Sequence, residues 1–209
     1  MKSENGNIHD PEVDNIQASI RRDKKLEIMK YKQDVKYVIG EHHVQLGTIF
    51  AVHPAAYVKD WLKFRDGKLI ERKSYKVALG ERPPDRDELD EPEMAYSKND
   101  PWSLHFLLPM ENDASGEVCI FSTNTVGGKA GVIELCDAWV QRAKTEGKKG
   151  RPIVKLGEKE MPTAKQGVKM RPFFEITGWD DEDGEALEVN LPVQKAVIKR
   201  DDMDDEIPF

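Results

Sequence analysis

The chain has few of the residues and patterns that mark secreted or membrane proteins. Only two of its 209 residues are cysteine, Cys119 and Cys136. That is too few for a disulfide framework, and the apolar pattern around each favours a buried thiol. No apolar run approaches the roughly 20 residues that a membrane helix needs. Residues 1–10 lack the basic and then apolar pattern of a secretory signal, so we expect a cytoplasmic location.

Metal-binding and catalytic motifs are also lacking. None of the histidines is paired with cysteine or a carboxylate at the spacing of a zinc site; they are His9, His42, His43, His53 and His105. The acids of residues 85–93 could be imagined as a two-metal nuclease cluster. They lie in a proline-rich stretch, however, where solvated charge is the better account. We therefore expect no metal, no cofactor and no enzymatic activity.

A glycine pair raises the question of phosphate binding. Gly127-Gly128-Lys129 comes at the start of a predicted helix, where free N–H groups attract anions. The nucleotide-binding loop pattern would need glycine in place of Thr123, and serine or threonine in place of Ala130. This excludes nucleoside triphosphate binding and leaves two alternatives, a plain turn or a contact with a single DNA phosphate.

Negative charge is concentrated at the C-terminal end. The whole chain has 32 Lys and Arg against 39 Asp and Glu, a net charge of −7. Residues 180–209 hold 11 acids and 3 bases, a balance of −8, so the other 179 residues sum to +1. A near-neutral body with an acidic tail is compatible with nucleic-acid binding, which the overall charge would have argued against.

The pattern of apolar residues predicts a mostly β, α+β body. β-Branched and aromatic residues favour strands over Val35–Ile39, Val44–Val52, Tyr57–Arg65, Lys68–Leu79, Trp102–Leu108, Glu117–Thr123, Pro152–Glu160 and Lys169–Trp179. Helical spacing predicts one main helix over Lys129–Glu146, capped by Gly147. One helix among antiparallel strands suits an OB-like barrel over residues 35–180. The other expected parts are a mobile polar arm (1–34), a long loop (80–98) and a disordered acidic tail (181–209).

Asp66-Gly67 is the clearest local signal in the body. This pair favours a two-residue hairpin turn, which fixes the register of the flanking strands and hence their two faces. The face expected to pack on the core carries Val58, Asp60, Leu62, Phe64, Leu69, Glu71, Lys73, Tyr75, Val77 and Leu79. The other face carries Tyr57, Lys59, Trp61, Lys63, Arg65, Lys68, Ile70, Arg72, Ser74 and Lys76.

Six of the ten residues on that second face are Lys or Arg, and none is acidic. Cations along a backbone and rings that stack on bases are what single-strand binding requires. We expect Tyr57 and Trp61 to stack on bases. The expected phosphate contacts are Lys59, Lys63, Arg65, Lys68, Arg72 and Lys76. The alternative is a solvated hairpin whose charges protect a sheet edge.

The last nine residues combine an acidic tether with an apolar end. They include Asp201, Asp202, Asp204, Asp205, Glu206, Ile207, Pro208 and Phe209. Acids keep such a segment solvated, and proline reduces the entropy that is lost on docking. The ring of Phe209 can fill a pocket while its terminal carboxylate meets a cation. The alternative is an acidic extension that only adds solubility.

This ending resembles the tail of bacterial and phage single-stranded-DNA-binding proteins, which ends in acids followed by Ile-Pro-Phe. The resemblance covers about nine residues and not the body, and it points more to a phage or prophage member than to a housekeeping one. It implies that the tail docks on replication, repair and recombination enzymes while the body coats single-stranded DNA. Two other interpretations are an adaptor that competes for the same docking pockets without binding DNA, and a metal-dependent phage nuclease.

Overall fold

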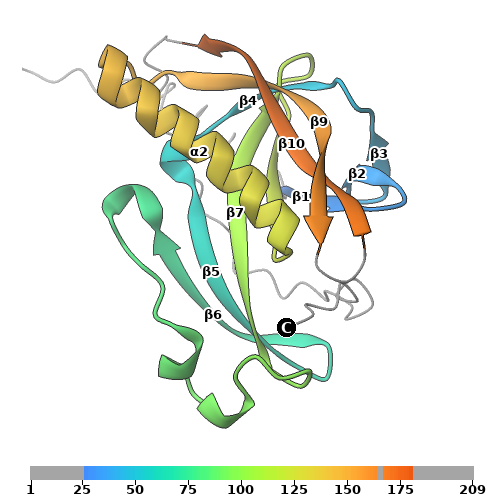
Figure 1. Ribbon diagram of the computed structural model, residues 1–209, viewed down its shortest axis with the longest axis vertical. Coiled ribbons are helices and arrows are strands. Elements are labelled where there is room, and N and C mark those ends of the chain that lie inside the picture. Colours follow the sequence, from blue (N-terminus) through green and yellow to red (C-terminus); the bar gives the residue numbers. More distant parts are fainter. Residues whose placement is uncertain (1–25, 164–166, 181–209) are drawn as a thin grey trace, which may run out of the picture.

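A strongly curled, open sheet of ten strands forms the body of the protein in the computed structural model, which describes residues 26–163 and 167–180 (Figure 1). Its strands are β1 (Glu27–Lys32), β2 (Lys36–Ile39), β3 (His42–Val44), β4 (Ile49–Val52), β5 (Val58–Arg65), β6 (Lys68–Lys76), β7 (Trp102–Asn112), β8 (Val118–Thr123), β9 (Arg151–Thr163) and β10 (Gly167–Asp180). One long helix, α2 (Val126–Glu146), crosses one side of it. The expected mostly β body with one main helix is confirmed for the described residues.

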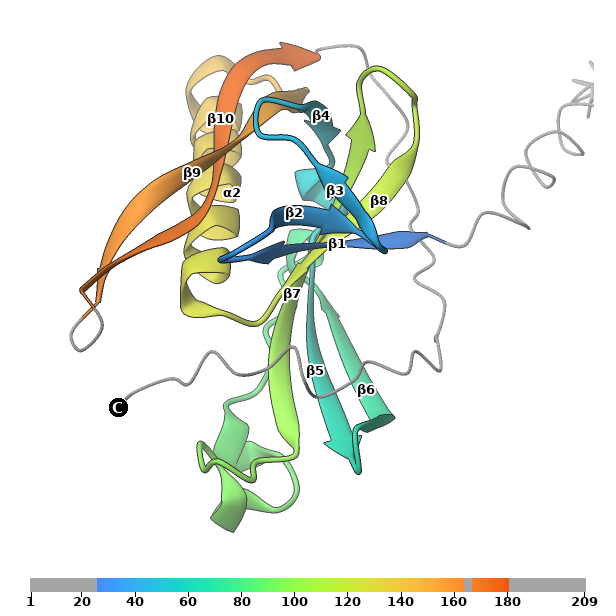
Figure 2. The same ribbon diagram turned by 90° about the vertical axis from the view of Figure 1, so that its right-hand side faces the viewer.

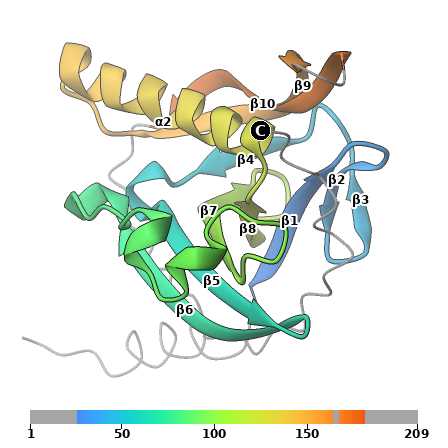
Figure 3. The same cartoon turned by 60° about the horizontal axis from the view of Figure 1, so that its bottom comes forward.

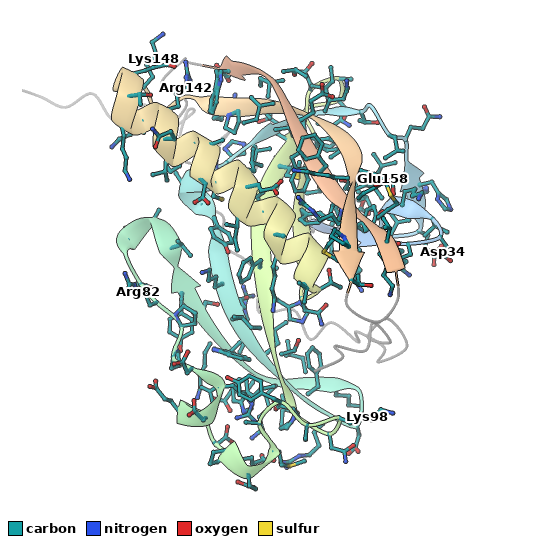
Figure 4. The ribbon with its side chains drawn as sticks, viewed as in Figure 1. Asp34, Arg82, Lys98, Arg142, Lys148 and Glu158 are labelled. Carbon is teal, nitrogen blue, oxygen red and sulfur yellow. The ribbon has the colours of Figure 1, made fainter. Side chains whose placement is uncertain are left out.

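The sheet runs in the order β10-β9-β4-β7-β8-β1-β2-β3, and β5 joins it through β7 while β6 pairs with β5. The pairs are antiparallel except β1 with β8, which is parallel. Because the sheet curls, its two ends approach each other, and side chains connect them. The Tyr37 hydroxyl donates to the Gly157 carbonyl at 2.8 Å, and Lys36 pairs with Glu158 at 2.8 Å. Glu158 is labelled on β9 in Figure 4, facing the strands of the N-terminal end.

Strand β1 corrects the expected domain boundary. The sequence predicts a polar arm over residues 1–34, but Glu27–Lys32 pairs with both β2 and β8. Its Met29 is fully buried in the main core. Within β1 only Met29 is buried and its neighbours are half-buried or exposed, so the sequence of this strand gives a weak signal. Residues 1–25 lie outside the described part of the chain, as does the acidic tail.

Gly47 divides another expected strand. Val44–Val52 is predicted as one strand, but β3 already ends at Val44, and Gly47, with a positive φ of 90°, lies in the turn that leads to β4. The two strands lie in different parts of the sheet, with β3 at its edge and β4 between β7 and β9.

Helix α2 packs tightly on the β9–β10 hairpin, and together they cover the main core (Figure 2). The Thr125 hydroxyl caps the helix by accepting from the Gly128 N–H, so the helix begins three residues before the expected Lys129. Glycines allow the close approach: a Cβ on Gly131 would lie 2.7 Å from the Pro172 carbonyl oxygen. The main core lies beneath, formed by Met29, Tyr37, Phe50, Val52, Tyr57, Phe106, Leu108, Met110, Cys119, Phe121, Val132, Leu135, Val154, Leu156 and Phe174.

Cys119 is buried, as the sequence predicts, whereas Cys136 is only half-buried; both are free thiols. No helix in the described part of the chain has the length and apolar character needed to cross a bilayer.

We predict that Gly131→Ala lowers the free energy of unfolding by roughly 1–3 kcal/mol, because the added methyl group meets a backbone carbonyl that cannot move away. In an exposed helix the same change would stabilise the protein by up to about 1 kcal/mol. Urea denaturation followed by circular dichroism measures the difference, with the exposed Gln141→Ala as control. A stabilised Gly131→Ala variant would contradict the close helix–sheet packing.

Candidate nucleic-acid interface

A β-bulge divides the predicted basic face of the β5–β6 hairpin. The turn is as expected, with positive φ at both Asp66 and Gly67 and Arg65 opposite Lys68. Beyond it, Lys63 pairs with Glu71 but Phe64 with Leu69, which leaves Ile70 as the extra residue of β6. The register expected for the rest of β6 is therefore wrong by one residue.

The shift moves residues of β6 to the opposite face from the one expected. Lys59, Trp61 and Lys63 share a face with Tyr75, Lys73 and Glu71, their cross-strand partners. Arg72, Ser74 and Lys76 lie on the other face, beside Leu62, Asp60 and Val58. The single basic, acid-free face is thus not formed.

The two aromatic residues predicted to stack on bases are buried. Tyr57 packs edge-on against Phe106 in the main core, with ring centroids 5.6 Å apart. Trp61 forms a second small core with Leu89 and Trp102, and its indole N–H donates to the Pro84 carbonyl at 3.0 Å. Neither ring is available as a stacking platform in this structure.

Residues 81–101 cover Trp61 and include most of the segment expected to be a long loop; we call them the cover. It contains the short 3₁₀ helices η3 (Arg86–Glu88) and η4 (Pro92–Met94), which lie over the β5–β7 region (Figure 3). Lys63 is 95 % buried under it and pairs with both Asp90 and Glu91. The sequence predicts that Asp90 and Glu91 are solvated and that Lys63 contacts DNA. In the structure the two acids neutralise this lysine.

Arg86 anchors this cover and is missed by sequence reasoning. Its side chain is 1 % exposed, and its Nε donates to the two carboxylate oxygens of Asp100 at 2.8 and 2.9 Å. The other guanidinium nitrogens donate to the carbonyls of Asp90 and Glu91, each at 3.1 Å. An arginine within a charged, proline-rich stretch gives no signal of burial, because it pairs with an acid 14 residues later.

The remaining hairpin cations have different surroundings. Arg72 pairs with the buried Asp60 at 2.5 Å, and burial raises the pKa of Asp60 while Arg72 opposes that shift. Arg65 is exposed at the hairpin tip, 3.4 Å from Glu91. Lys68 and Lys76 are exposed. Arg72 and Lys76 lie on the opposite face of the hairpin from Arg65 and Lys68, so these four cations do not form one track.

Lys59 has a different partner, which comes from a distant part of the sequence. Its ammonium lies 4.9 Å from the centroid of the Phe106 ring, and that of Lys129 lies 5.6 Å from the same centroid. Burial, followed by repulsion from Lys59, lowers the pKa of Lys129. The charges of Lys129 and Lys30 also act on His105, whose pKa is lowered to about 3, mainly by burial. Strand β5 and the start of α2 thus bring two ammonium groups to one ring of β7.

A second polar cluster joins strand ends across the sheet. Nη1 of Arg151 lies 2.9 Å from Glu111 and 3.4 Å from Nε2 of the buried His53. The Nε of Arg151 donates to Asp180 at 3.0 Å. Burial and then Arg151 lower the pKa of His53 to about 4, against the opposing effect of Glu111. A neutral His53 can accept from Arg151, so the cluster ties together β7, β9 and β10.

Within residues 26–163 and 167–180, no three His, Cys, Asp or Glu side chains gather in a way that could hold a metal ion. The predicted partner-docking residues, 201–209, lie outside the described residues. Comparison of the chain with known protein families, curated proteins and solved structures finds no match.

We predict that Arg86→Leu destabilises the protein by about 3 kcal/mol or more, because it leaves Asp100 without its cation in a largely buried position. The exposed Glu88→Gln, two residues away, should change stability by less than about 0.5 kcal/mol. Chemical denaturation measures both values. Equal stability of the two variants would show that the cover is not anchored through Arg86.

We also predict that the protein loses stability as pH falls from about 6.5 to about 4. In that window the unfolded chain protonates His53, with an ordinary pKa of about 6.5, while the folded chain does not. Unfolding free energies measured across this range should therefore fall less steeply for His53→Gln than for the unaltered protein. The exposed His42→Gln is the matched control and should keep the full slope. If His53→Gln kept it too, the buried neutral state of His53 would be refuted.

Proposed function

We propose that this chain is a single-stranded-DNA-binding protein that coats DNA and recruits replication, repair and recombination enzymes through its C-terminal tail. The observation that carries the proposal is the ending, in which five acids precede Ile207, Pro208 and the terminal Phe209. This arrangement concentrates docking energy at one ring and one carboxylate and adds longer-range attraction from the acids. A phage or prophage origin agrees with the same resemblance.

The body supports the proposal in two ways. A curled sheet with a single helix is compatible with an OB-like barrel, an architecture whose sheet face and loops bind oligonucleotides in other proteins. The lysines beside Phe106 supply positive charge on the surface between β5 and α2. Single-strand binding needs such charge along the backbone.

One observation favours a second candidate, an adaptor that uses the tail without binding DNA. The hairpin face that would have supplied both rings and cations is divided by the bulge and partly covered by residues 81–101. Of the eight residues expected to contact DNA, Tyr57, Trp61 and Lys63 are buried, and Arg72 is held by Asp60. DNA binding is therefore the measurement that separates the two candidates.

We predict that the intact protein binds oligo-dT more tightly than duplex of equal length, with an affinity that falls steeply as salt rises. Fluorescence anisotropy at several salt concentrations measures this. No binding to either substrate would leave the adaptor as the better candidate, and equal affinity for both would contradict single-strand selectivity.

We predict that deletion of Phe209, or addition of one residue after it, abolishes binding to an enzyme that recognises such tails, because either change displaces the terminal ring or its carboxylate. DNA affinity should be unchanged or slightly higher. A pull-down with the intact chain and the two variants tests the tail separately from the body. Identical partner binding by all three would leave only a solubilising extension.

A further inference from the structure

Six cationic side chains lie over aromatic rings in the described part of the chain: Lys59, Lys63, Lys73, Lys129, Arg142 and Lys159. Four of them also pair with a carboxylate. Lys63 pairs with Asp90 and Glu91, and Lys73 pairs with Glu71. Arg142, labelled near the end of α2 in Figure 4, pairs with Glu146, and Lys159 pairs with Glu134.

Lys59 and Lys129 differ from the other four. Among residues 26–163 and 167–180, neither has a carboxylate within salt-bridge distance, and both approach the same ring. The pairing brings together strand β5 and the first turns of α2, which are 70 residues apart in the sequence. Two like charges on one ring repel each other, and the attraction of the ring for each of them is weak.

The surroundings increase the cost of this arrangement. Lys129 is half-buried, and burial together with the Lys59 charge lowers the pKa of Lys129. It also lies one turn after the Thr125 cap, where the positive end of the helix dipole disfavours a cation. A cation that loses water without gaining an anion destabilises the folded state. An anion bound between the two ammonium groups would remove this penalty.

We propose that Lys59 and Lys129 form a binding site for a backbone phosphate of single-stranded nucleic acid, beside Phe106. The inference rests on the proposed function and assigns its contact surface. Phe106 is 5 % exposed and packed edge-on by Tyr57, so it holds the two ammonium groups in place and does not stack on a base. The strand therefore passes this point with a phosphate inward.

Such a site can be recognised because the loss of one of its lysines should change stability and DNA affinity in opposite directions. Removal of one lysine relieves repulsion in the free protein but leaves a phosphate without its cation. Lys59→Gln should therefore raise the melting temperature by about 2 °C or more and weaken oligo-dT binding roughly 5- to 20-fold. The plot of log affinity against log salt should become less steep by about 0.7 for each phosphate that the protein no longer neutralises.

The experiment compares Lys59→Gln and Lys129→Gln with two controls that remove the same charge elsewhere. Lys144 is exposed near the end of α2 and Lys149 is exposed just after it, so Lys144→Gln and Lys149→Gln serve as these controls. Lys59→Arg keeps the charge and should keep the binding, which separates charge from packing. Binding is measured by anisotropy with oligo-dT, and stability by thermal unfolding with and without pyrophosphate.

Weaker binding by both site variants, with near-normal affinity in the controls and in Lys59→Arg, supports the site. Equal oligo-dT affinity of the intact protein and the two site variants overturns the site and leaves the proposed function standing. If the intact protein binds no oligo-dT, the proposed function fails and so does the nucleic-acid assignment. In that case the melting temperature with pyrophosphate decides. A rise in the intact protein that Lys59→Gln abolishes supports an anion site, and the absence of any rise in the intact protein overturns the site.

Discussion

Strand β7 is the element on which the rest of the described structure depends. One edge pairs first with β5, through Trp102–Leu107, and then with β4, through Met110–Asn112, while the other edge pairs with β8. Pro109 lies where the first edge changes partner, and its carbonyl accepts from the His53 N–H at 3.0 Å. Since a residue's N–H and C=O point to the same side of a strand, the N–H that proline lacks falls at this change of partner. Proline is tolerated in a central strand for that reason.

This sharing of one edge produces two packed regions on a single sheet. Where β7 pairs with β4 and β8, the sheet curls under α2 and the β9–β10 hairpin, and the main core forms there. Where β7 pairs with β5, the sheet extends away from the helix, and residues 81–101 cover it around Trp61 and Trp102. Phe106 lies between them, beside the start of α2 and the ammonium of Lys59. Lys59 and Lys129 thus lie where the two packed regions adjoin, at the ring of Phe106.

Local chemistry makes much of this fold predictable. Most of the strands, the Asp66-Gly67 turn and the helix follow from turn residues and periodicity, because those signals act over a few residues. The bulge at Ile70 cannot be predicted in this way. It leaves the pattern of strand-forming residues unchanged, but it reverses the faces of the residues that follow it in β6. The burial of Arg86 and Lys63 is not predictable from the sequence either, because charged residues are normally exposed to solvent. The sequence suggests a phosphate contact at the helix start near Lys129. It does not predict that Lys59, 70 residues earlier, lies at the same ring.

The distribution of charge limits how such a protein can hold a nucleic acid. Outside residues 180–209 the chain sums to only +1, so overall attraction to a polyanion is weak. Several of the hairpin cations are neutralised within the fold by Asp60, Asp90 and Glu91. Under the proposed function, binding depends on the cations that the described part of the fold leaves without a carboxylate and holds in fixed positions. Two lysines kept apart from carboxylates at a cost in stability meet that requirement better than a larger number of exposed lysines, whose charges water and salt already screen.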